Sequence, residues 1–416
     1  MPNRQTRILL FALSLWCSVV QTPAVSAQVL SGIDILAQRN FDLLQGKRIG
    51  LITNQTGRSA NGSSSIDLLS TAPAVQLVAL FSPEHGIRGE ADVKLDSGVD
   101  LITGLPIHSL YGTSCRPTPE MLTNIELLVF DIQDIGARFY TYIGTLHHAL
   151  RAAKTHGIPL VVLDRPNPIS GSELAGALPD PTEIAKHLTA DSTGCRSLTI
   201  THPIPTRHGL TIGELARLIN HEAGIDADLQ IVPMSGWQRR MAWNETGLPW
   251  INPSPNMKDP TAALLYPGLG ILEATNLSVA RGTDFPFHRY GAPWIVPAAV
   301  ITQLPHLPGF RFRPTSFTPT APGHPYRDQL CHGIEVTVTD PRLADPILAG
   351  LHLVQAIYRA HPKQYRAHNG FHSMVGDWSA WQRLTAGGES PEQVISGWQQ
   401  RLEQFKQRRE QYLLYI

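Results

Sequence analysis

The chain has 416 residues, with 34 acidic and 34 basic side chains and a formal net charge of zero at neutral pH. This length exceeds what one ordinary hydrophobic core serves, so we expect two domains. Because the charges balance and form no long block of one sign, they give no indication of a nucleic acid or an acidic membrane surface as partner. A small anionic ligand is still compatible with this composition.

The first 27 residues have the pattern of a secretory signal peptide. Residues 1–7 carry positive charge, residues 8–20 are mainly apolar, and small residues at 25–27 precede Gln28, as at a cleavage site. The apolar run is short for a membrane span, and no later stretch of about twenty apolar residues follows it. We therefore expect a periplasmic or secreted protein that begins near Gln28 and is not stably inserted in a membrane.

An exported chain keeps three cysteines, Cys115, Cys195 and Cys331. Three cysteines allow at most one disulfide and leave one thiol over, which excludes a disulfide scaffold. Their spacing does not fit a closed zinc site. We therefore expect a hydrophobic core that is sufficient by itself.

Four apolar segments share one layout, in which a predicted strand ends in polar or turn residues. These segments span residues 47–54, 75–81, 125–131 and 158–164. Helical segments are expected at 65–70 and 145–154. Strands that alternate with helices form βαβ units of a parallel sheet, and right-handed crossovers bring the C-terminal strand ends to one edge. Ligands bind at that edge in open α/β sheets.

The chain then continues with a helix at 211–220, begun by a capping box of Thr211 and Glu214, and with a further strand at 228–233. A segment rich in Pro and Gly follows and carries several tryptophans, which either line a ligand or pack between domains.

The last third is predicted to form a smaller α+β domain. It contains an alternating strand at 334–339, an amphipathic helix at 344–359 and a long helix at 391–412. We place the boundary near residue 300, which gives domains of residues 28–300 and 301–416.

The segment 82–89 is the strongest site for chemistry. Pro83 fixes the direction in which the chain leaves the strand, and two glycines flank a charged group of Glu84, His85 and Arg88. We take Glu84 as the catalytic residue. The alternative is a surface turn with solvated charges.

Three further segments place polar side chains at strand ends or in stiff loops. They are 131–142 with Asp131, Gln133, Asp134, Arg138 and Tyr140; 164–168 with Asp164, Arg165 and Asn167; and 280–287 with Arg281 and Asp284. Asn54 ends the first strand. Polar groups this dense need partners, which are either a substrate or each other in a structural network.

Several common chemistries have no motif here: the chain lacks a Gly-x-Ser-x-Gly elbow, a His-Glu-x-x-His helix and a phosphate-binding Gly-x-x-x-x-Gly-Lys loop. A metal site at Glu84, His85, Asp131 and Asp164 is a minor alternative, because the spacing is loose and histidines are few. We expect no cofactor and no metal. A cleft rich in carboxyl groups favours glycoside hydrolysis, and arginine suits a substrate that carries a carboxylate.

The same segments resemble the exo-β-N-acetylmuramidase family of the NamZ type, secreted or periplasmic glycoside hydrolases that remove terminal N-acetylmuramic acid from peptidoglycan fragments. The resemblance lies in residues 50–57, 81–89, 131–142, 163–168, 276–284 and 412–415. It implies an α/β protein with a Rossmann-like parallel sheet domain, a smaller C-terminal α+β domain and a sugar-binding cleft between them. It also implies that Glu84 is the acid/base residue.

One departure from the family pattern stands out. The family commonly has Val-Glu-Gly where this chain has Leu174-Ala175-Gly176, with Glu173 just before it. Either Glu173 takes over the role of the usual glutamate, or activity or specificity is altered. The alternatives to the muramidase are a muropeptide-binding protein without catalysis and a metal-dependent hydrolase.

Our hypothesis gives Glu84 the role of proton donor and Asp131, Asp134 or Asp164 that of second carboxylate, unless the 2-acetamido group of the sugar acts as the nucleophile. Arg138, Arg165 or Arg281 would hold the lactyl carboxylate. The expected partners are muramyl saccharides derived from peptidoglycan; the sequence makes no prediction of oligomeric state. The expected binding residues are Asn54, His85, Arg88, Gln133, Asp134, Arg138, Tyr140, Arg165, Asn167, Arg281 and Asp284.

Overall fold

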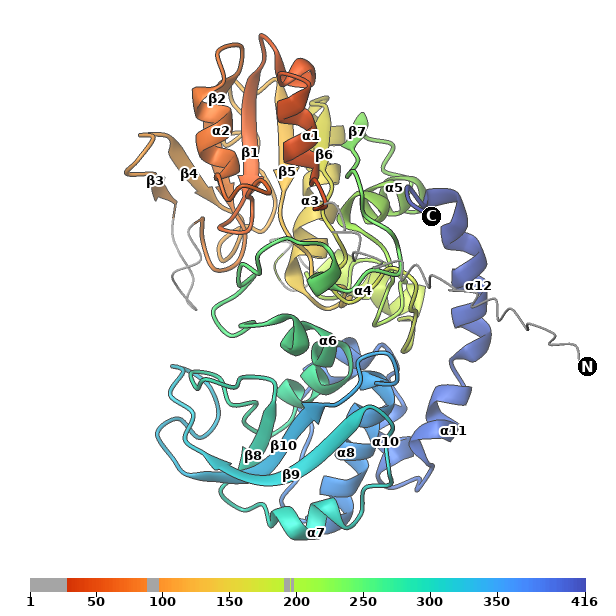
Figure 1. Cartoon of the computed structure of the whole chain (residues 1–416). Helices are drawn as coiled ribbons and strands as arrows, with labels where there is room; N and C mark the ends of the chain where they lie inside the picture. The colour runs from red at the N-terminus through yellow and green to blue at the C-terminus, as the bar shows by residue number, and fades with distance from the viewer. Residues whose placement is uncertain (1–27, 88–96, 191–194, 196–197) are drawn as a thin grey trace, which may run out of the picture.

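The computed structural model describes residues 28–87, 97–190, 195 and 198–416. It has two parts, one built on a seven-stranded sheet and the other on a three-stranded sheet (Figure 1). Among the described residues, no helix has both the length and the apolar character needed to cross a membrane.

The larger sheet has the strand order β3-β4-β2-β1-β5-β6-β7. Its strands are β1 Arg48–Thr53, β2 Gln76–Ser82, β3 Gly98–Val99, β4 Pro106–Ser109, β5 Leu127–Asp131, β6 Leu160–Leu163 and β7 Leu229–Val232. All neighbours pair in parallel except β3 with β4. The predicted parallel sheet is therefore confirmed, and β3 and β4 extend it at one edge.

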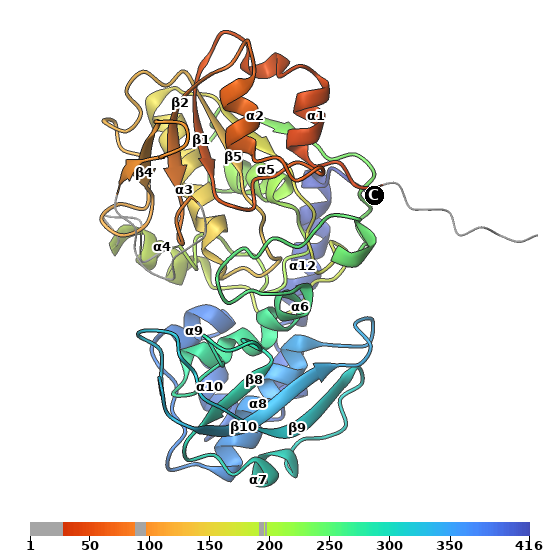
Figure 2. The same ribbon diagram turned by 60° about the vertical axis from the view of Figure 1, so that its left-hand side comes forward.

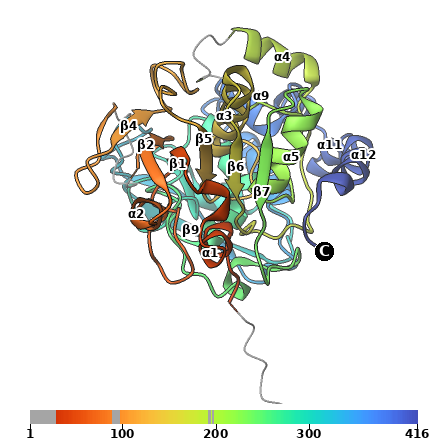
Figure 3. The ribbon, with the colours of Figure 1, turned by 90° about the horizontal axis from the view of Figure 1, so that it is seen from above.

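Helices cover both faces of this sheet, so its central strands are buried on both sides (Figure 3). On one face, α1 (Gly32–Gln38) and α2 (Ser65–Thr71) pack on side chains such as Leu51 and Val129. On the other, α3 (Thr141–His156) and α5 (Ile212–Glu222) share a core with Ile52 and Phe130. Successive strand residues point to opposite faces, which explains the continuous apolar runs in the sequence.

The smaller sheet is antiparallel, with the order β8-β10-β9. Its strands are β8 Arg289–Ala292, β9 Phe310–Phe317 and β10 Cys331–Val338, and α8 (Pro346–Ala360) follows them. The predicted boundary near residue 300 lies beyond β8, although β8 pairs with β10. The chain changes from one sheet to the other between β7 and β8.

The remaining helices are distributed over both parts of the molecule. They are α4 Pro181–Ala190, α6 Pro260–Leu269, α7 Pro297–Ile301, α9 Gly370–Val375, α10 Ala380–Leu384, α11 Pro391–Ser396 and α12 Gln399–Arg409, with short 3-10 helices η1 Asp42–Leu44, η2 Trp243–Glu245, η3 Gly270–Ala274 and η4 Glu410–Tyr412. Helix α6 lies at the junction of the two domains (Figure 2). The helix predicted at 391–412 is divided into α11 and α12, since α11 ends at Ser396 with Gly397 as its C-cap and α12 begins at Gln399.

The end of the chain returns to the first domain, with α12 running along its side (Figure 1). Arg401 donates hydrogen bonds to the carbonyl groups of Leu178 and Pro179. The hydroxyl group of Tyr415 donates to Asp164, at the end of β6, over 2.6 Å. One apolar cluster extends from α3 and α5 to α8 and α12, so the two domains share a continuous core.

Candidate active site

The two domains enclose a cavity of about 550 Å³, a volume usual for small-molecule sites. Its walls are the loops after β2 and β4, the start of α3, and the segments around η3 and α9. The principal lining residues are Glu84, His85, Tyr111, Tyr140, Thr141, Thr199, Ser254, Tyr266, Glu273, Arg281, Phe287, His324, His368 and Met374. Among the described lining residues, two carry carboxylates, Glu84 from the first domain and Glu273 from the second.

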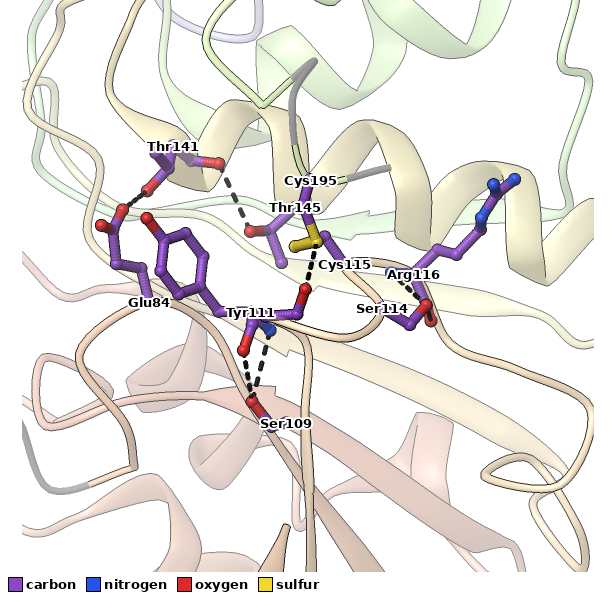
Figure 4. Close-up of a disulfide and its surroundings, with 10 residues drawn as sticks. Glu84, Ser109, Tyr111, Ser114, Cys115, Arg116, Thr141, Thr145 and Cys195 are labelled. Carbon is purple, nitrogen blue, oxygen red and sulfur yellow. Dashed lines mark hydrogen bonds between the residues drawn. A yellow bond between two sulfur atoms is a disulfide. The ribbon is translucent and has the colours of Figure 1, made fainter. Parts of the chain in front are cut away.

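Glu84 lies just beyond the C-terminal end of β2, as the sequence predicts. Its Oε2 atom accepts a hydrogen bond of 2.7 Å from the hydroxyl group of Thr141, the first residue of α3. His85 follows in the left-handed backbone region, with φ of 72°, so the loop turns sharply after Glu84. Figure 4 shows Thr141 and the ring of Tyr111 beside the Glu84 side chain.

Glu273 faces this cavity from η3. Its Oε1 atom accepts a hydrogen bond of 2.6 Å from Nε of Arg281, and its Oε2 atom accepts one of 3.1 Å from the hydroxyl group of Tyr266. The Arg281 guanidinium also lies over the ring of Phe287, 5.1 Å from its centroid. The second carboxylate is therefore held by an arginine inside the cavity. The sequence analysis missed Glu273; the one signal was its position three residues before the segment 276–284.

Four residues of the predicted site line this cavity: Glu84, His85, Tyr140 and Arg281. Arg88 lies outside the described residues. The Asp284 side chain is 93% exposed and lies 4.0 Å from Lys258, and it is not part of the cavity wall.

Asp131 is fixed in a buried ion pair, which argues against the catalytic role proposed for it. Its carboxylate receives two hydrogen bonds from Arg165, of 2.6 and 2.9 Å, and a third from the hydroxyl group of Ser65. Both members of the pair are almost inaccessible to solvent. Asp131 and Arg165 therefore stabilise the interior of the first domain rather than line the cavity.

Asp164 is likewise fully buried and away from the cavity wall. It accepts hydrogen bonds from the hydroxyl groups of Thr211 and Tyr415 and from the backbone N–H of Gly213. It thus joins β6 to the start of α5 and to the end of the chain. This is a structural role, and we withdraw the catalytic one.

Burial raises the pKa of Asp164 to about 6, compared with about 4 in an unfolded chain. Between these pH values the folded protein holds a proton that the unfolded chain has released, so the contribution of Asp164 to stability falls as the pH rises. The variant Asp164→Asn has a neutral side chain and should lack this pH-dependent contribution to stability. We expect its free energy of unfolding to rise relative to wild type by up to about 3 kcal/mol between pH 4 and 7. Urea unfolding of both proteins across this range measures the difference, and a constant difference would contradict the assignment.

The remaining predicted residues bind neighbouring backbone or side-chain groups. The Asn54 side chain accepts from Thr56, and Asp134 accepts from the backbone N–H of Gly136 and lies 3.2 Å from His208. Gln133 and Asn167 donate to backbone carbonyl groups, and so does Arg138, whose partners are Thr199 and Met374. Arg138 thereby joins the two domains behind the cavity wall.

A second hollow, of about 600 Å³, lies where α4 meets α10, α11 and α12. Its charged groups are engaged, since Arg383 binds Glu389 and Asp377. The cavity that contains Glu84 is therefore the candidate active site. Within the described part of the chain, no group of three or more His, Cys, Asp and Glu side chains is arranged to hold a metal ion.

Comparisons with known proteins agree with this two-domain arrangement. Models of the N-terminal and C-terminal domains of the exo-β-N-acetylmuramidase NamZ match residues 49–261 and 264–415. The chain belongs to the NamZ family. It is 43% identical over 399 residues to the peptidoglycan β-N-acetylmuramidase NamZ of Bacillus subtilis. The aligned region covers 94% of this chain and 92% of that protein.

Two solved structures from Bacteroides fragilis, both of DUF1343 family proteins, are similar to this NamZ family member over nearly all of its length. One is 35% identical, with a TM-score of 0.83, and covers 95% of this chain and 100% of that one. The other is 29% identical, with a TM-score of 0.72, and covers 94% and 99%.

The departure from the NamZ family pattern at 174–176 lies outside the cavity. Ala175 forms backbone hydrogen bonds in both directions with Arg207, and Glu173 is exposed to solvent. Neither residue is part of the cavity wall. Residues 173–176 therefore contribute no side chain to the described wall around Glu84 and Glu273, and Glu173 does not replace a carboxylate there.

Proposed function

We propose that this protein is an exo-acting β-N-acetylmuramidase that hydrolyses terminal N-acetylmuramic acid from peptidoglycan fragments. The observation that carries the proposal is the cavity between the domains, which brings together Glu84 and Glu273 in a member of the NamZ family. Most glycoside hydrolases use a pair of carboxyl groups on either side of the bond that is cleaved.

In the proposed mechanism, protonated Glu84 donates its proton to the glycosidic oxygen as the bond from that oxygen to the anomeric carbon breaks. The leaving sugar keeps the bonding electron pair as a hydroxyl group. Water finally adds to the anomeric carbon and gives a proton to the carboxylate of Glu84, which restores the acid. Glu273 accepts hydrogen bonds from Arg281 and Tyr266. It acts as the second carboxylate, the role that the sequence analysis assigned to Asp131, Asp134 or Asp164. It stabilises positive charge at the anomeric carbon, directly or while the 2-acetamido group attacks.

Arg281 is the arginine proposed to recognise the lactyl carboxylate, which distinguishes muramic acid from glucosamine. Arg281 lines the cavity, where its Nε donates to Glu273, whereas neither Arg165 nor Arg138 is part of the cavity wall. The rings of Tyr140, Tyr266 and Phe287 pack edge to face beside it. Such a surface suits the apolar faces of a sugar ring.

We further propose that the protein is exported to the periplasm or secreted. The predicted signal peptide lies outside the described residues. Support comes from the disulfide between Cys115 and Cys195, because disulfides persist mainly in oxidising compartments. Cys331 is the thiol left over, buried in the second domain.

Two disaccharides with opposite sugar order test the proposed activity. We expect the purified protein to release free N-acetylmuramic acid from MurNAc-β-1,4-GlcNAc and to leave GlcNAc-β-1,4-MurNAc intact, because only the first has muramic acid at its non-reducing end. Mass spectrometry of the products measures this. Binding of the first disaccharide without cleavage would support the binding-protein alternative, and loss of cleavage in chelator would support the metal-dependent one.

A further inference from the structure

The loop after β4 forms part of the cavity wall that contains Glu84. The backbone N–H of Leu110 donates a hydrogen bond of 2.8 Å to the carbonyl group of Ser82, two residues before Glu84. Tyr111 comes next and lines the cavity together with Glu84. Figure 4 shows its ring beside the Glu84 side chain. The ring is half-buried, so one part of it is available to a ligand.

This loop has little regular structure to hold it. Ser109 bonds the backbone of Tyr111 through its hydroxyl group, at 3.0 and 3.3 Å, and Ser114 bonds the backbone of Arg116 in the same way. Turns of this kind are weak. A covalent bond adds to them, since Cys115, which is fully buried, forms a disulfide with Cys195.

The other end of the disulfide, Cys195, lies four residues before the wall residue Thr199 in the sequence. Cys195 lies 80 residues away in sequence, and its sulfur lies 3.4 Å from the carbonyl oxygen of Gly112. Thr199 accepts a hydrogen bond from Arg138. The disulfide therefore ties the loop that carries Tyr111 to a residue close in sequence to Thr199, and both Tyr111 and Thr199 line the cavity.

We propose that Tyr111 is a sugar-binding residue that stacks on the substrate beside Glu84, and that the Cys115–Cys195 disulfide positions it there. The inference rests on the proposed muramidase function and adds to it a binding residue and a dependence on oxidation. An aromatic ring gains from stacking on a sugar only if it is held in place, because ordering a free side chain on binding costs affinity. Reduction of the disulfide thus weakens substrate binding while it leaves the proton donor in position.

A double-mutant cycle on a chromogenic N-acetylmuramide tests the proposal. We expect KM to rise about tenfold in Tyr111→Ala and also in the double variant Cys115→Ser/Cys195→Ser. A tenfold change corresponds to the binding free energy of one aromatic contact, and kcat should change less. KM of the variant that combines all three changes should rise no further than in either variant alone, because the disulfide affects binding through the ring of Tyr111. Tyr111→Phe should restore binding. Full activity without the disulfide, or losses that multiply in the combined variant, would overturn the proposal.

Cys331→Ala provides the matched control, since this cysteine is buried in the second domain, forms no disulfide and does not line the cavity; it should behave as wild type. If the paired serine variant does not fold, wild-type protein is reduced with dithiothreitol below its unfolding temperature, and the freed thiols are counted by alkylation and mass analysis. KM should rise on reduction and recover on reoxidation; an unchanged KM with both thiols freed would overturn the proposal. Inactive wild-type protein would instead refute the muramidase function itself.

Discussion

Glu84→Gln is expected to lower kcat on MurNAc-β-1,4-GlcNAc by about 10²- to 10⁴-fold, the usual contribution of a general acid. The amide has the same shape and can still accept the hydrogen bond from Thr141, but it has no acidic proton for the glycosidic oxygen. An aryl glycoside with a strongly acidic leaving group needs less protonation. The loss should therefore be much smaller on such a substrate, and steady-state kinetics on both substrates measures the contrast.

The control for this variant is Glu335→Gln. Glu335 lies on β10, where it forms an ion pair with Arg289 at 2.8 Å, and it is not part of the cavity wall. Its replacement should leave kcat unchanged. Turnover near the wild-type rate by Glu84→Gln on the disaccharide would reject Glu84 as the proton donor.

Asp131→Ala should be among the most destabilising single changes in the chain, with a loss of about 3 to 5 kcal/mol in the free energy of unfolding. The change leaves the guanidinium of Arg165 buried and without its carboxylate. Chemical denaturation measures the loss. Glu84→Gln should change this free energy by less than about 0.5 kcal/mol, because it removes no buried charge pair.

The paired replacement Asp131→Leu/Arg165→Met gives the matched comparison, because it removes both charges together. It should recover much of the stability lost in Asp131→Ala. A stable Asp131→Ala protein that has lost turnover would contradict the structural role and restore Asp131 as a catalytic residue.

The sheet was predictable from sequence because buried parallel strands are continuous apolar runs, such as Leu127–Asp131 and Leu160–Leu163. The start of α5 was equally clear, since the capping box of Thr211 and Glu214 is a local signal and is present in the structure. Glu84 was placed at the correct strand end by the same argument.

The rest of the site depends on contacts that strand patterns do not contain. Asp131 and Asp164 also follow buried strands, yet they turn to partners 34 and 251 residues away, Arg165 and Tyr415. Glu273 was missed because it enters the cavity from the second domain. How two domains dock is decided by their surfaces, and the order of strands and helices along the chain does not reveal it.

The return of the last residues to the first domain has a consequence for biosynthesis. Tyr415 reaches Asp164, and the backbone N–H of Leu414 donates to Glu214 in α5. The N-terminal half thus lacks these partners while the ribosome is still adding the C-terminal half. A nascent or prematurely terminated polypeptide that lacks residues 414 and 415 therefore carries this edge of the Rossmann-like domain without its partners.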